Sequence, residues 1–463
     1  MSKVAAEAAP AAAPATAATS YGWYTVGVLT IAYVFSFVDR SILTLLVGPI
    51  RADLGISDTQ ISLLHGLAFA IFYTLLGIPI ASLADRRNRR NIIAVGVAFW
   101  SIATAACGLT RNFWQLFLAR IGVGVGEAAL SPAAYSMIAD SFPPEKLGRA
   151  LSVYTLGAIA GIGFALIIGG AVIGSVMTAT DVPLPVVGTV RPWQLVFFIV
   201  GLPGLLVALW ILTLREPVRR RLPMAGEGSG LKPLLRHMRL HWQSYAAHLA
   251  GFALLSIVLN SLTAWTPSHF IRTFGQSPGQ AGFWLGILIA TFGTSGIIAG
   301  GWWSDRAQRR NRPDGPLRTG VISAVGSLLF GVAAPLAGSL ELALALYAPL
   351  LFFSTFAYGA APAAVQMMTP APMRAVASAI YLFFLNLVGM GLGPLVTAAV
   401  TDYVFGNDLA VGRSLALVVG VSATLSALLL AWGCRHFRAT VHGQRQGAGP
   451  AGAPSGATTI GRA

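Results

Sequence analysis

ASLADRRNRRN at residues 81–91 and GWWSDRAQRRN at residues 301–311 are two versions of one charged motif. Each follows the second long apolar segment of its half of the sequence. The matching positions are Asp85 with Asp305, Arg86 with Arg306, Arg89 with Arg309 and Arg90 with Arg310. A motif repeated at corresponding places indicates an internal repeat, so we expect two similar halves.

The composition is that of a membrane protein. The 463 residues are 55% hydrophobic and 10% charged, whereas about a quarter of the residues in a soluble domain are charged. Apolar segments of about 20 residues, enough to cross a ~30 Å hydrocarbon layer, recur along nearly the whole chain. They are too long and too continuously apolar for a β-barrel. Twelve are predicted, at residues 22–50, 59–84, 91–109, 113–139, 147–177, 193–214, 242–272, 279–304, 317–338, 342–369, 374–402 and 413–436.

The longest polar interruption divides these segments into six and six. We predict an all-α integral membrane protein of twelve transmembrane helices in two pseudo-symmetric six-helix bundles, residues 21–214 and 242–438, joined by a cytoplasmic linker at 215–241. The Ala- and Gly-rich ends, 1–20 and 439–463, are predicted to be disordered tails.

The net charge of +15 arises mainly from basic residues in the termini and the even-numbered loops. The odd-numbered loops hold only Arg51, Arg111, Arg191, Arg272 and Arg413. This asymmetry follows the positive-inside rule, so both termini are expected in the cytoplasm. The basic excess then sets the topology, and we expect no nucleic-acid partner.

The D-R-x-x-R-R loop after the second and eighth of twelve segments resembles the major facilitator superfamily. Three stretches resemble its spinster-like branch: SFVDRSIL (36–43), DLGISDTQISLLHGLAFAIFYTLLGIPIASLADR (53–86) and RIGVGVGEAALSPAAYSMIADSFPPEKLGRALSVY (120–154). The resemblance implies the major facilitator fold in a bacterial homologue that acts as a monomer. It also implies alternating access between the two halves.

The repeated loops are predicted to form a cytoplasmic gate. Asp85 ends its helix, where the helix dipole disfavours a carboxylate, and so needs a partner elsewhere. By resemblance, Asp85 would bind near the start of the eleventh helix and Asp305 near the fifth. The loops depart from the superfamily pattern at Ala81, Asn88 and Gln308, and the alternative is a solvated, topology-setting charge run. The predicted gate residues are Asp85, Arg86, Arg89, Arg149, Asp305, Arg306, Arg309 and Arg374.

Asp39, Arg40, Arg120 and Glu127 lie well inside predicted membrane segments. A charge at the bilayer centre costs about 2.5–3.5 kcal/mol on insertion scales, so each is a functional candidate. Asp39 and Arg40 point about 100° apart on a helix, whereas Arg120 and Glu127 share one face. We predict that Asp39 pairs with Arg120 and Arg40 with Glu127, and that the cluster couples protons to substrate. The alternative is a static network that locks the first helix to the fourth.

The second half has neutral polar residues at comparable depth. A cavity with one charged wall and one largely apolar wall would suit an amphipathic molecule with an ionic head. The spinster resemblance implies such a substrate, a lysophospholipid or a sphingoid derivative, although these side chains could also pack between helices. The candidate lining residues are His65, Asn260, Thr263, Tyr358, Gln366, Tyr381 and Asn386.

The predicted function is that of a proton-coupled secondary transporter of a lipid-like substrate in the bacterial inner membrane, working by alternating access. Transport of small organic anions or drugs by proton symport or antiport is the alternative, and a non-transporting receptor is a weaker one. An enzyme acting on lipids would need a nucleophile with its base, or a metal cluster, and the sequence shows neither. We therefore expect no enzyme activity, no metal and no cofactor.

Overall fold

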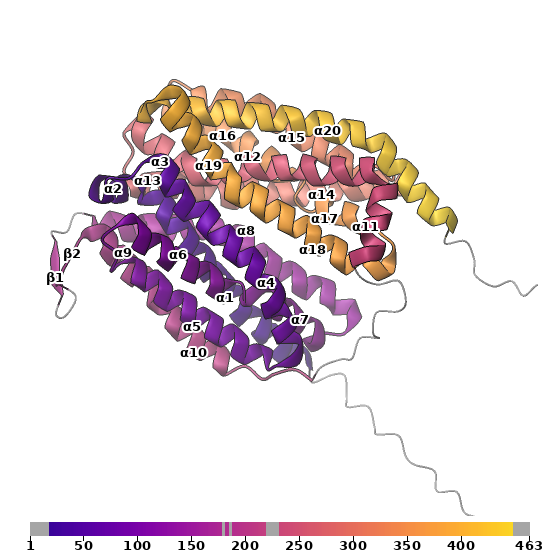
Figure 1. The fold of residues 1–463 in the computed structure, drawn as a ribbon, viewed down its shortest axis with the longest axis horizontal. Helices are drawn as coiled ribbons and strands as arrows, with labels where there is room; N and C mark the ends of the chain where they lie inside the picture. The colour runs from indigo at the N-terminus through magenta and orange to yellow at the C-terminus, as the bar shows by residue number, and fades with distance from the viewer. Residues whose placement is uncertain (1–17, 178–180, 185–187, 219–230, 448–463) are drawn as a thin grey trace, which may run out of the picture.

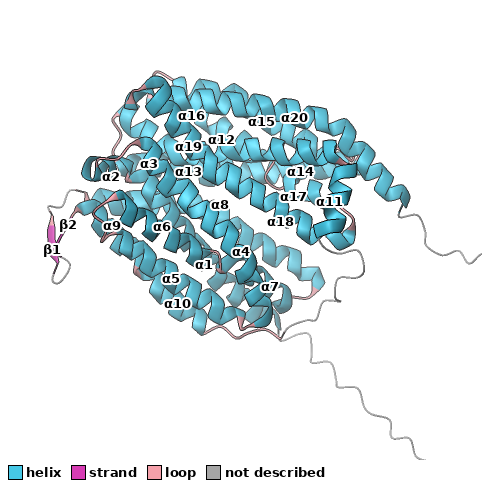
Figure 2. Ribbon diagram, in the orientation of Figure 1, coloured by secondary structure: helices cyan, strands magenta, loops and turns pink. Residues whose placement is uncertain are grey.

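The computed structural model describes residues 18–177, 181–184, 188–218 and 231–447. These residues form two helical bundles that follow one another along the chain (Figure 1). Figure 2 shows the only strands of this part of the chain as one short pair, β1 (Val182–Leu184) and β2 (Gly188–Val190), which are antiparallel. The predicted all-α architecture of two bundles is confirmed.

The first half has short extra helices where its membrane segments bend or break. Proline or glycine stands at several of these breaks, as at Pro203 between α9 and α10 and at Gly66 within η1. Its helices are α1 (Ala18–Leu45), α2 (Val47–Leu54), α3 (Asp58–Ser62), η1 (Leu63–Leu67), α4 (Ala68–Arg86), α5 (Arg89–Cys107), α6 (Phe113–Glu127), α7 (Leu130–Ser141), α8 (Pro144–Val176), α9 (Pro192–Gly201) and α10 (Pro203–Leu212).

The second half begins with a short helix in the predicted linker and continues with six long helical segments. Three of its short segments, η2, η5 and η6, are π-helical, a local widening that is frequent at functional sites. Its helices are α11 (Leu231–Leu240), α12 (Trp242–Phe274), α13 (Pro278–Leu288), η2 (Ile289–Gly293), α14 (Thr294–Arg309), α15 (Gly315–Ala333), η3 (Ala334–Leu336), α16 (Leu340–Phe356), α17 (Ala360–Met368), η4 (Ala371–Met373), α18 (Arg374–Phe384), η5 (Leu385–Leu392), α19 (Gly393–Ala399), η6 (Val400–Phe405), η7 (Asp408–Ala410) and α20 (Val411–Gly447).

The membrane segments agree with the sequence prediction. Eleven helical segments among the described residues are long and apolar enough to span a membrane. The helix at the remaining predicted position, α8, is 33 residues long and contains the shorter apolar stretch Gly161–Val176. The protein is therefore a multi-pass membrane protein.

The boundaries of both predicted tails need correction, and the first helix, α1, already begins at Ala18, inside the predicted tail 1–20. The last helix, α20, continues to Gly447, so the first part of the predicted tail 439–463 is helical. Phe437 and Val441 are buried in the core of the second half, which explains why the helix continues. The predicted linker contains α11, while 1–17, 219–230 and 448–463 lie outside the described residues, and the tails predicted there stay predictions.

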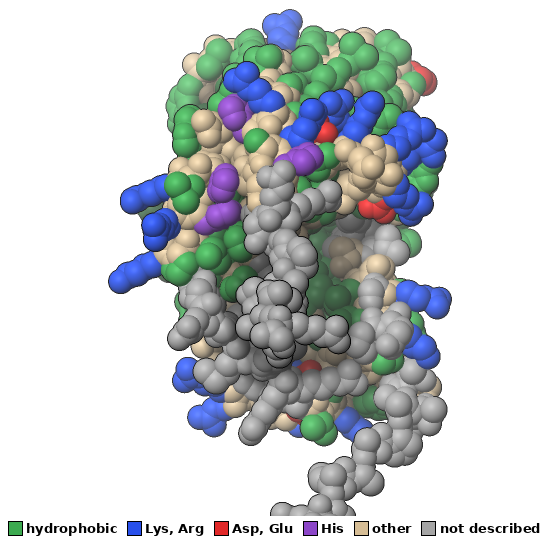
Figure 3. Space-filling view, turned by 90° about the vertical axis from the view of Figure 1, so that its right-hand side faces the viewer, with side chains coloured by type: hydrophobic (Ala, Val, Ile, Leu, Met, Phe, Trp, Pro, Cys, Tyr) green, Lys and Arg blue, Asp and Glu red, His purple; other side chains and the backbone are tan. Residues whose placement is uncertain are grey.

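The halves meet at one end of the molecule and diverge at the other (Figure 1). We call the meeting end, with α2, α3, β1–β2 and η7, the paired end. The other end, with α11 and both ends of the described chain, is the basic end. Figure 3 looks onto the basic end and shows the surface hollowed between the halves, with hydrophobic side chains in the recess.

Glycines allow the halves to approach closely where α8 crosses α13. A Cβ atom on Gly163 would lie 2.7 Å from the backbone oxygen of Gly286, and one on Gly170 would lie 2.9 Å from that of Gly279. Real Cβ atoms do not come this close to another backbone. Only glycine therefore permits this contact, which fixes the halves against each other.

Asp314 joins the loop after α14 to the last helix. Its carboxylate, buried in the protein, accepts hydrogen bonds from Arg318 at 2.7 Å and Arg438 at 2.8 Å. Burial by itself raises the pKa of Asp314, but the two arginines outweigh burial and hold this pKa below its usual value. The folded protein therefore favours the charged carboxylate.

We expect Asp314→Asn to lower the thermal stability at neutral pH, because bonds to a charged group contribute about 1.5–3 kcal/mol. A lowered folded pKa stabilises the protein fully above the unfolded value of about 3.9. The contribution is lost as the pH falls through the folded pKa. Melting curves in detergent should therefore separate wild type from Asp314→Asn at pH 7 and converge as the pH falls from about 4 through the lower folded pKa. Asp181→Asn, at an exposed loop position, is the control, and a pH-independent gap would contradict the linkage.

Candidate functional site

Arg40 of α1 and Glu127 of α6 form a buried ion pair, as predicted. The Nε atom of Arg40 donates a hydrogen bond of 2.6 Å to Oε2 of Glu127, and its Nη2 contacts the same oxygen. The Glu127 side chain is fully buried, while 14% of the Arg40 side chain is exposed. The Arg40 guanidinium also lies over the ring of Phe69, 4.4 Å from the ring centre. The pair therefore lies at the edge of an accessible space rather than in a closed core.

Asp39 and Arg120 lie close together but do not form the predicted side-chain ion pair. Arg120 instead donates hydrogen bonds to two backbone oxygens, that of Asp39 at 3.2 Å and that of Leu64 at 3.4 Å. Leu64 belongs to the π-helical segment η1, in which the regular helical bonding is interrupted. This acceptor explains the difference, because the sequence does not reveal a π-segment.

Several buried polar atoms of this cluster have no hydrogen-bond partner within the described chain. They are Oδ1 of Asp39, Oε1 of Glu127, Nη2 of Arg120 and Nδ1 of His65. Leaving such an atom unpaired costs about 1–3 kcal/mol or more. The two carboxylate oxygens in this set can accept a proton or a hydrogen bond. The cluster therefore has unused hydrogen-bonding capacity in this conformation.

Aromatic side chains that the sequence prediction overlooked surround Arg40. Phe37 and Tyr73 each have ring centres 5.2 Å from its guanidinium. Tyr33 stacks on Tyr154 with ring centres 4.8 Å apart. The sequence could have predicted these neighbours, because the spacing of Tyr33, Phe37 and Arg40 places them on one face of α1.

Two further tyrosines are exposed although they belong to membrane segments. Tyr135 of α7 packs edge-on against Tyr154 and is 40% exposed. Tyr358, between α16 and α17 in the other half, is 49% exposed and within electrostatic range of Tyr135, Tyr73 and Arg40. Tyr358 of the second half therefore lies near the ion pair and the tyrosines of the first half.

The other predicted lining residues differ in burial and in the elements that they contact. His65 lines a small cavity between the halves with Trp265 and Pro394. Tyr381 is 5% exposed and packs against His248, inside the core of the second half. Half-buried or exposed positions are found for Asn260, Thr263, Gln366 and Asn386, of which Gln366 bonds Ser378 and Asn260 bonds Ser256.

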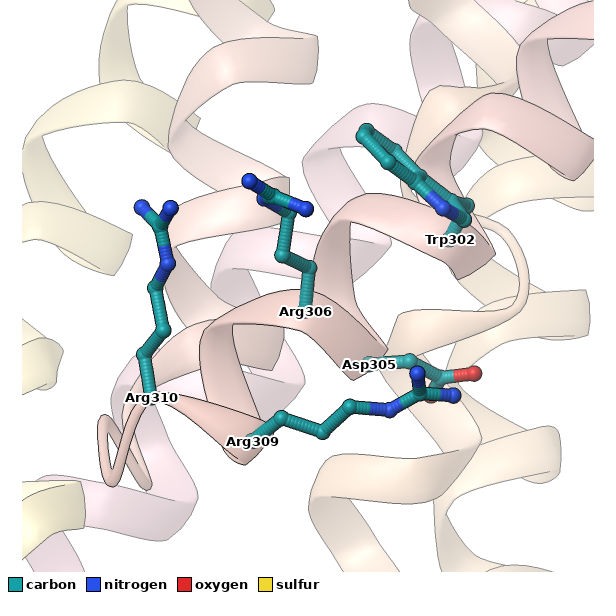
Figure 4. A pocket seen from close by; sticks show the side chains of 5 residues that line it. All are labelled: Trp302, Asp305, Arg306, Arg309 and Arg310. Atoms are coloured by element: carbon teal, nitrogen blue, oxygen red, sulfur yellow. The ribbon is translucent and has the colours of Figure 1, made fainter.

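The repeated loop of the second half is open at the basic end. Trp302, Asp305 and three arginines line a pocket of about 210 Å³, and Figure 4 shows Arg309 extending alongside Asp305 while Arg306 and Arg310 point elsewhere. Arg149 of α8 is exposed, and Arg374 bonds the backbone oxygen of Thr369 at 3.1 Å. Within the described residues, no hydrogen bond or ion pair joins the exposed Asp305 to α8, and the side chain of Asp85 lies outside the described residues. The exposed Arg86 ends α4.

Arg89, predicted as a gate residue, has no contact with the second bundle among the contacts described. It pairs with Asp140 and with Glu216, the latter at 2.7 Å, and it donates to Oγ of Ser136 at 2.9 Å. These contacts join the start of α5 to the end of α7 and to the chain beyond α10. The placement is that of a structural bridge, in contrast to the exposed Arg309 at the matching position.

A network at the paired end joins the halves, and the sequence prediction missed it. Arg272 of α12 binds both oxygens of the buried Asp58, at 2.5 and 2.7 Å. Arg51 lies 3.0 Å from Asp58 and 2.7 Å from Asp408. We call these four residues, together with the bond of Asp402 to Thr59, the paired-end network. Within the described residues, both ion pairs between the halves belong to it.

Three carboxylates of this network, those of Asp58, Asp402 and Asp408, lie within 4.8 Å of one another. Such a group can hold a metal ion. Here Arg51 and Arg272 compensate the charge of Asp58 and Asp408, while Asp402 accepts two bonds from Thr59 at 2.7 and 2.6 Å. We therefore interpret the group as an ion-pair network.

Comparisons with known proteins agree with this architecture. A family model described as Major Facilitator Superfamily matches residues 29–394. An MFS-type efflux pump of Mycolicibacterium smegmatis is 31% identical over 414 residues, which is 88% of this chain and 91% of the relative. Protein spinster of Drosophila melanogaster is 26% identical over 68% of this chain, and the match spans half of that protein's length.

Solved structures include a similar fold. The crystal structure of a bacterial homologue of the human lysosomal transporter Spinster, in an inward-facing and unoccupied conformation, superposes with a TM-score of 0.76. It is 27% identical, and the superposition covers 92% of this chain and 98% of the other.

Proposed function

Because this chain belongs to the Major Facilitator Superfamily and is a membrane transporter of a small molecule, we propose that it carries an amphipathic, lipid-like substrate across a bacterial inner membrane, driven by protons. The observation that carries this proposal is the buried Arg40–Glu127 pair beside tyrosines of both halves. The pair offers one charged wall, and the aromatic rings offer an apolar wall with hydroxyl groups.

The proposed coupling uses the two acids of the cluster. With Asp39 and Glu127 ionised, the four charges of the cluster cancel. A proton on Glu127 removes the partner of Arg40 and leaves that guanidinium positive in an aromatic surrounding. The anionic head of a substrate can then compensate Arg40, so proton and substrate binding are linked through one residue.

In the proposed cycle, the two ends of the protein are closed in turn. We assign the basic end to the cytoplasm, in agreement with the positive-inside rule, so the present conformation is open inwards. The paired-end network holds the outer side shut in this state. When the outer side opens, the loops carrying Asp85 and Asp305 would close the basic end against α18 and α8, with Arg149 and Arg374 close to those contacts.

The similarity to an efflux pump favours a second candidate, export of drug-like or small anionic molecules in exchange for protons. The same Arg40 site could hold a small carboxylate. The two candidates differ in the length of the apolar tail that the substrate requires.

Flux in proteoliposomes distinguishes the candidates. The panel contains lysophospholipids and sphingoid phosphates with tails of increasing length, and small carboxylates and cationic dyes without a tail, each with and without an imposed proton gradient. We expect gradient-dependent flux that rises with tail length. Flux of tail-less compounds alone would replace the lipid assignment by the second candidate, and flux independent of the gradient would remove proton coupling.

A further inference from the structure

The short helix α11 at the basic end has an arrangement of residues that the transport function does not use. Leu234 and Met238 pack into the core of the second half. On the opposite side, Lys232, Arg236 and Arg239 are exposed, at spacings of four and three residues that place them on one helix face. The helix therefore docks on the protein with one face and presents a basic face outwards.

Exposed apolar side chains flank this basic face. Leu231 is 54% exposed, Leu235 is 44% exposed, and Leu240 at the end of the helix is 71% exposed. A basic face bordered by exposed leucines is typical of helices that lie in the interface of a membrane with anionic lipids.

The position of α11 places it at the level of the lipid headgroups. It runs across the ends of the long helices in Figure 1, and the membrane segment of α12 begins two residues after its end, at Trp242. Trp242 is 55% exposed and packs against Trp432 of α20 with ring centres 6.1 Å apart. Tryptophan at the end of a membrane segment is characteristic of the membrane–water interface. Figure 3 shows Lys and Arg side chains standing out sideways from this half, next to histidines.

From these observations we propose that α11 is a binding site for anionic phospholipids of the adjoining membrane leaflet. Lys232, Arg236 and Arg239 contact the phosphate headgroups, while Leu231, Leu235 and Leu240 enter the upper acyl region. Each basic residue near an anionic surface contributes about 1 kcal/mol, or roughly a fivefold preference.

The site is connected to a helix that moves in the proposed cycle. His237 of α11 bonds the backbone oxygen of Met368 at 3.1 Å, and Tyr245 bonds Thr369 at 2.8 Å. Thr369 accepts the bond from Arg374, the first residue of α18. Lipid bound to α11 therefore steadies the connection between α17 and α18.

Hydrogen exchange of residues 231–241 in nanodiscs tests the site. The full-length protein is compared in pure phosphatidylcholine and in phosphatidylcholine with 30% phosphatidylglycerol, a composition of about one anionic lipid in three. We expect exchange to slow about tenfold or more with the anionic lipid. The combined variant K232Q, R236Q and R239Q should lose this protection. The combined variant R87Q, K146Q and R312Q removes three exposed charges elsewhere at the basic end and should keep it.

Three results would overturn the proposal. They are equal protection in the two lipid mixtures, equal protection by inorganic phosphate added to phosphatidylcholine discs, and loss of protection in both combined variants. Mass spectrometry of lipids retained by the purified protein gives a second measurement. Wild type should retain phosphatidylglycerol over phosphatidylcholine, and K232Q/R236Q/R239Q should not. Neither measurement depends on the transported substrate, so a failed substrate assignment leaves the result intact.

Discussion

Replacement of Glu127 by Gln is expected to abolish proton-driven flux while leaving the fold intact. Glu127 is fully buried, and one of its oxygens carries both contacts to Arg40 while the other has no partner. Gln keeps an oxygen for Arg40 but cannot lose a proton, so the positive charge of Arg40 is permanently uncompensated. We expect flux to fall at least tenfold, which corresponds to about 1.4 kcal/mol, and to become independent of the external pH.

Flux against pH in proteoliposomes measures this effect, with a substrate that the wild-type panel has identified. Glu341→Gln is the matched control, because Glu341 is exposed in the first turn of α16. Asp39→Asn is measured in parallel, and loss of pH dependence in one variant only would identify the proton carrier. Wild-type pH dependence in both would show that the cluster is a static lock between α1 and α6. Melting temperatures are needed as well, since breaking a buried pair can cost about 3–5 kcal/mol.

Replacement of Asp58 by Asn is expected to shift the protein towards the state that is open at the paired end. Asp58 is buried and takes three contacts from Arg51 and Arg272, so its loss breaks the strongest ionic link between the halves. Breaking a buried pair costs about 3–5 kcal/mol, which limits the change in the ratio of the two states to roughly 150-fold to 4,000-fold at most. The state that is open at the paired end lacks the contacts of Asp58 already, so the substitution does not destabilise it in this way.

Distances between spin labels measure the shift. Labels at Ala52 and Leu409, both exposed at the paired end, should move apart, and labels at Lys146 and Arg312 at the basic end should approach. The background lacks the native thiols of Cys107 and Cys434.

The control for this shift is Asp53→Asn, at the same end of the molecule. Asp53 binds Arg191 and Trp193, which are in its own half, so this variant removes a carboxylate without touching the link between the halves. An unchanged distance distribution in Asp58→Asn, or an equal shift in both variants, would exclude the proposed outer gate.

Part of the site was predictable because depth in a membrane can be counted along a helix. The 1.5 Å rise per residue places Arg40 and Glu127 at similar depth, and charges at that depth need partners. The same reasoning failed for Asp39 and Arg120, since the π-segment η1 offers a carbonyl to Arg120. The repeated loop, from which the gate was predicted, does not reveal the contacts of Arg89, whose partner Glu216 lies beyond α10, in a stretch that the sequence assigns only to a polar linker.

The membrane segments, the division into two halves and the four charges within the bilayer could be predicted from the amino-acid sequence. These properties depend on local hydropathy and on an internal repeat, and both can be read directly from the sequence. Which charges form contacts, and which end of the molecule is closed, became visible when the two halves were seen packed together. Arg272 and Asp58 are 214 positions apart, and Arg51 and Asp408 are 357 apart, so their contacts exist only because the halves dock. A charged residue at the polar end of a helix has no free-energy cost of burial in the bilayer. The local sequence around these residues therefore does not indicate that they form a gate.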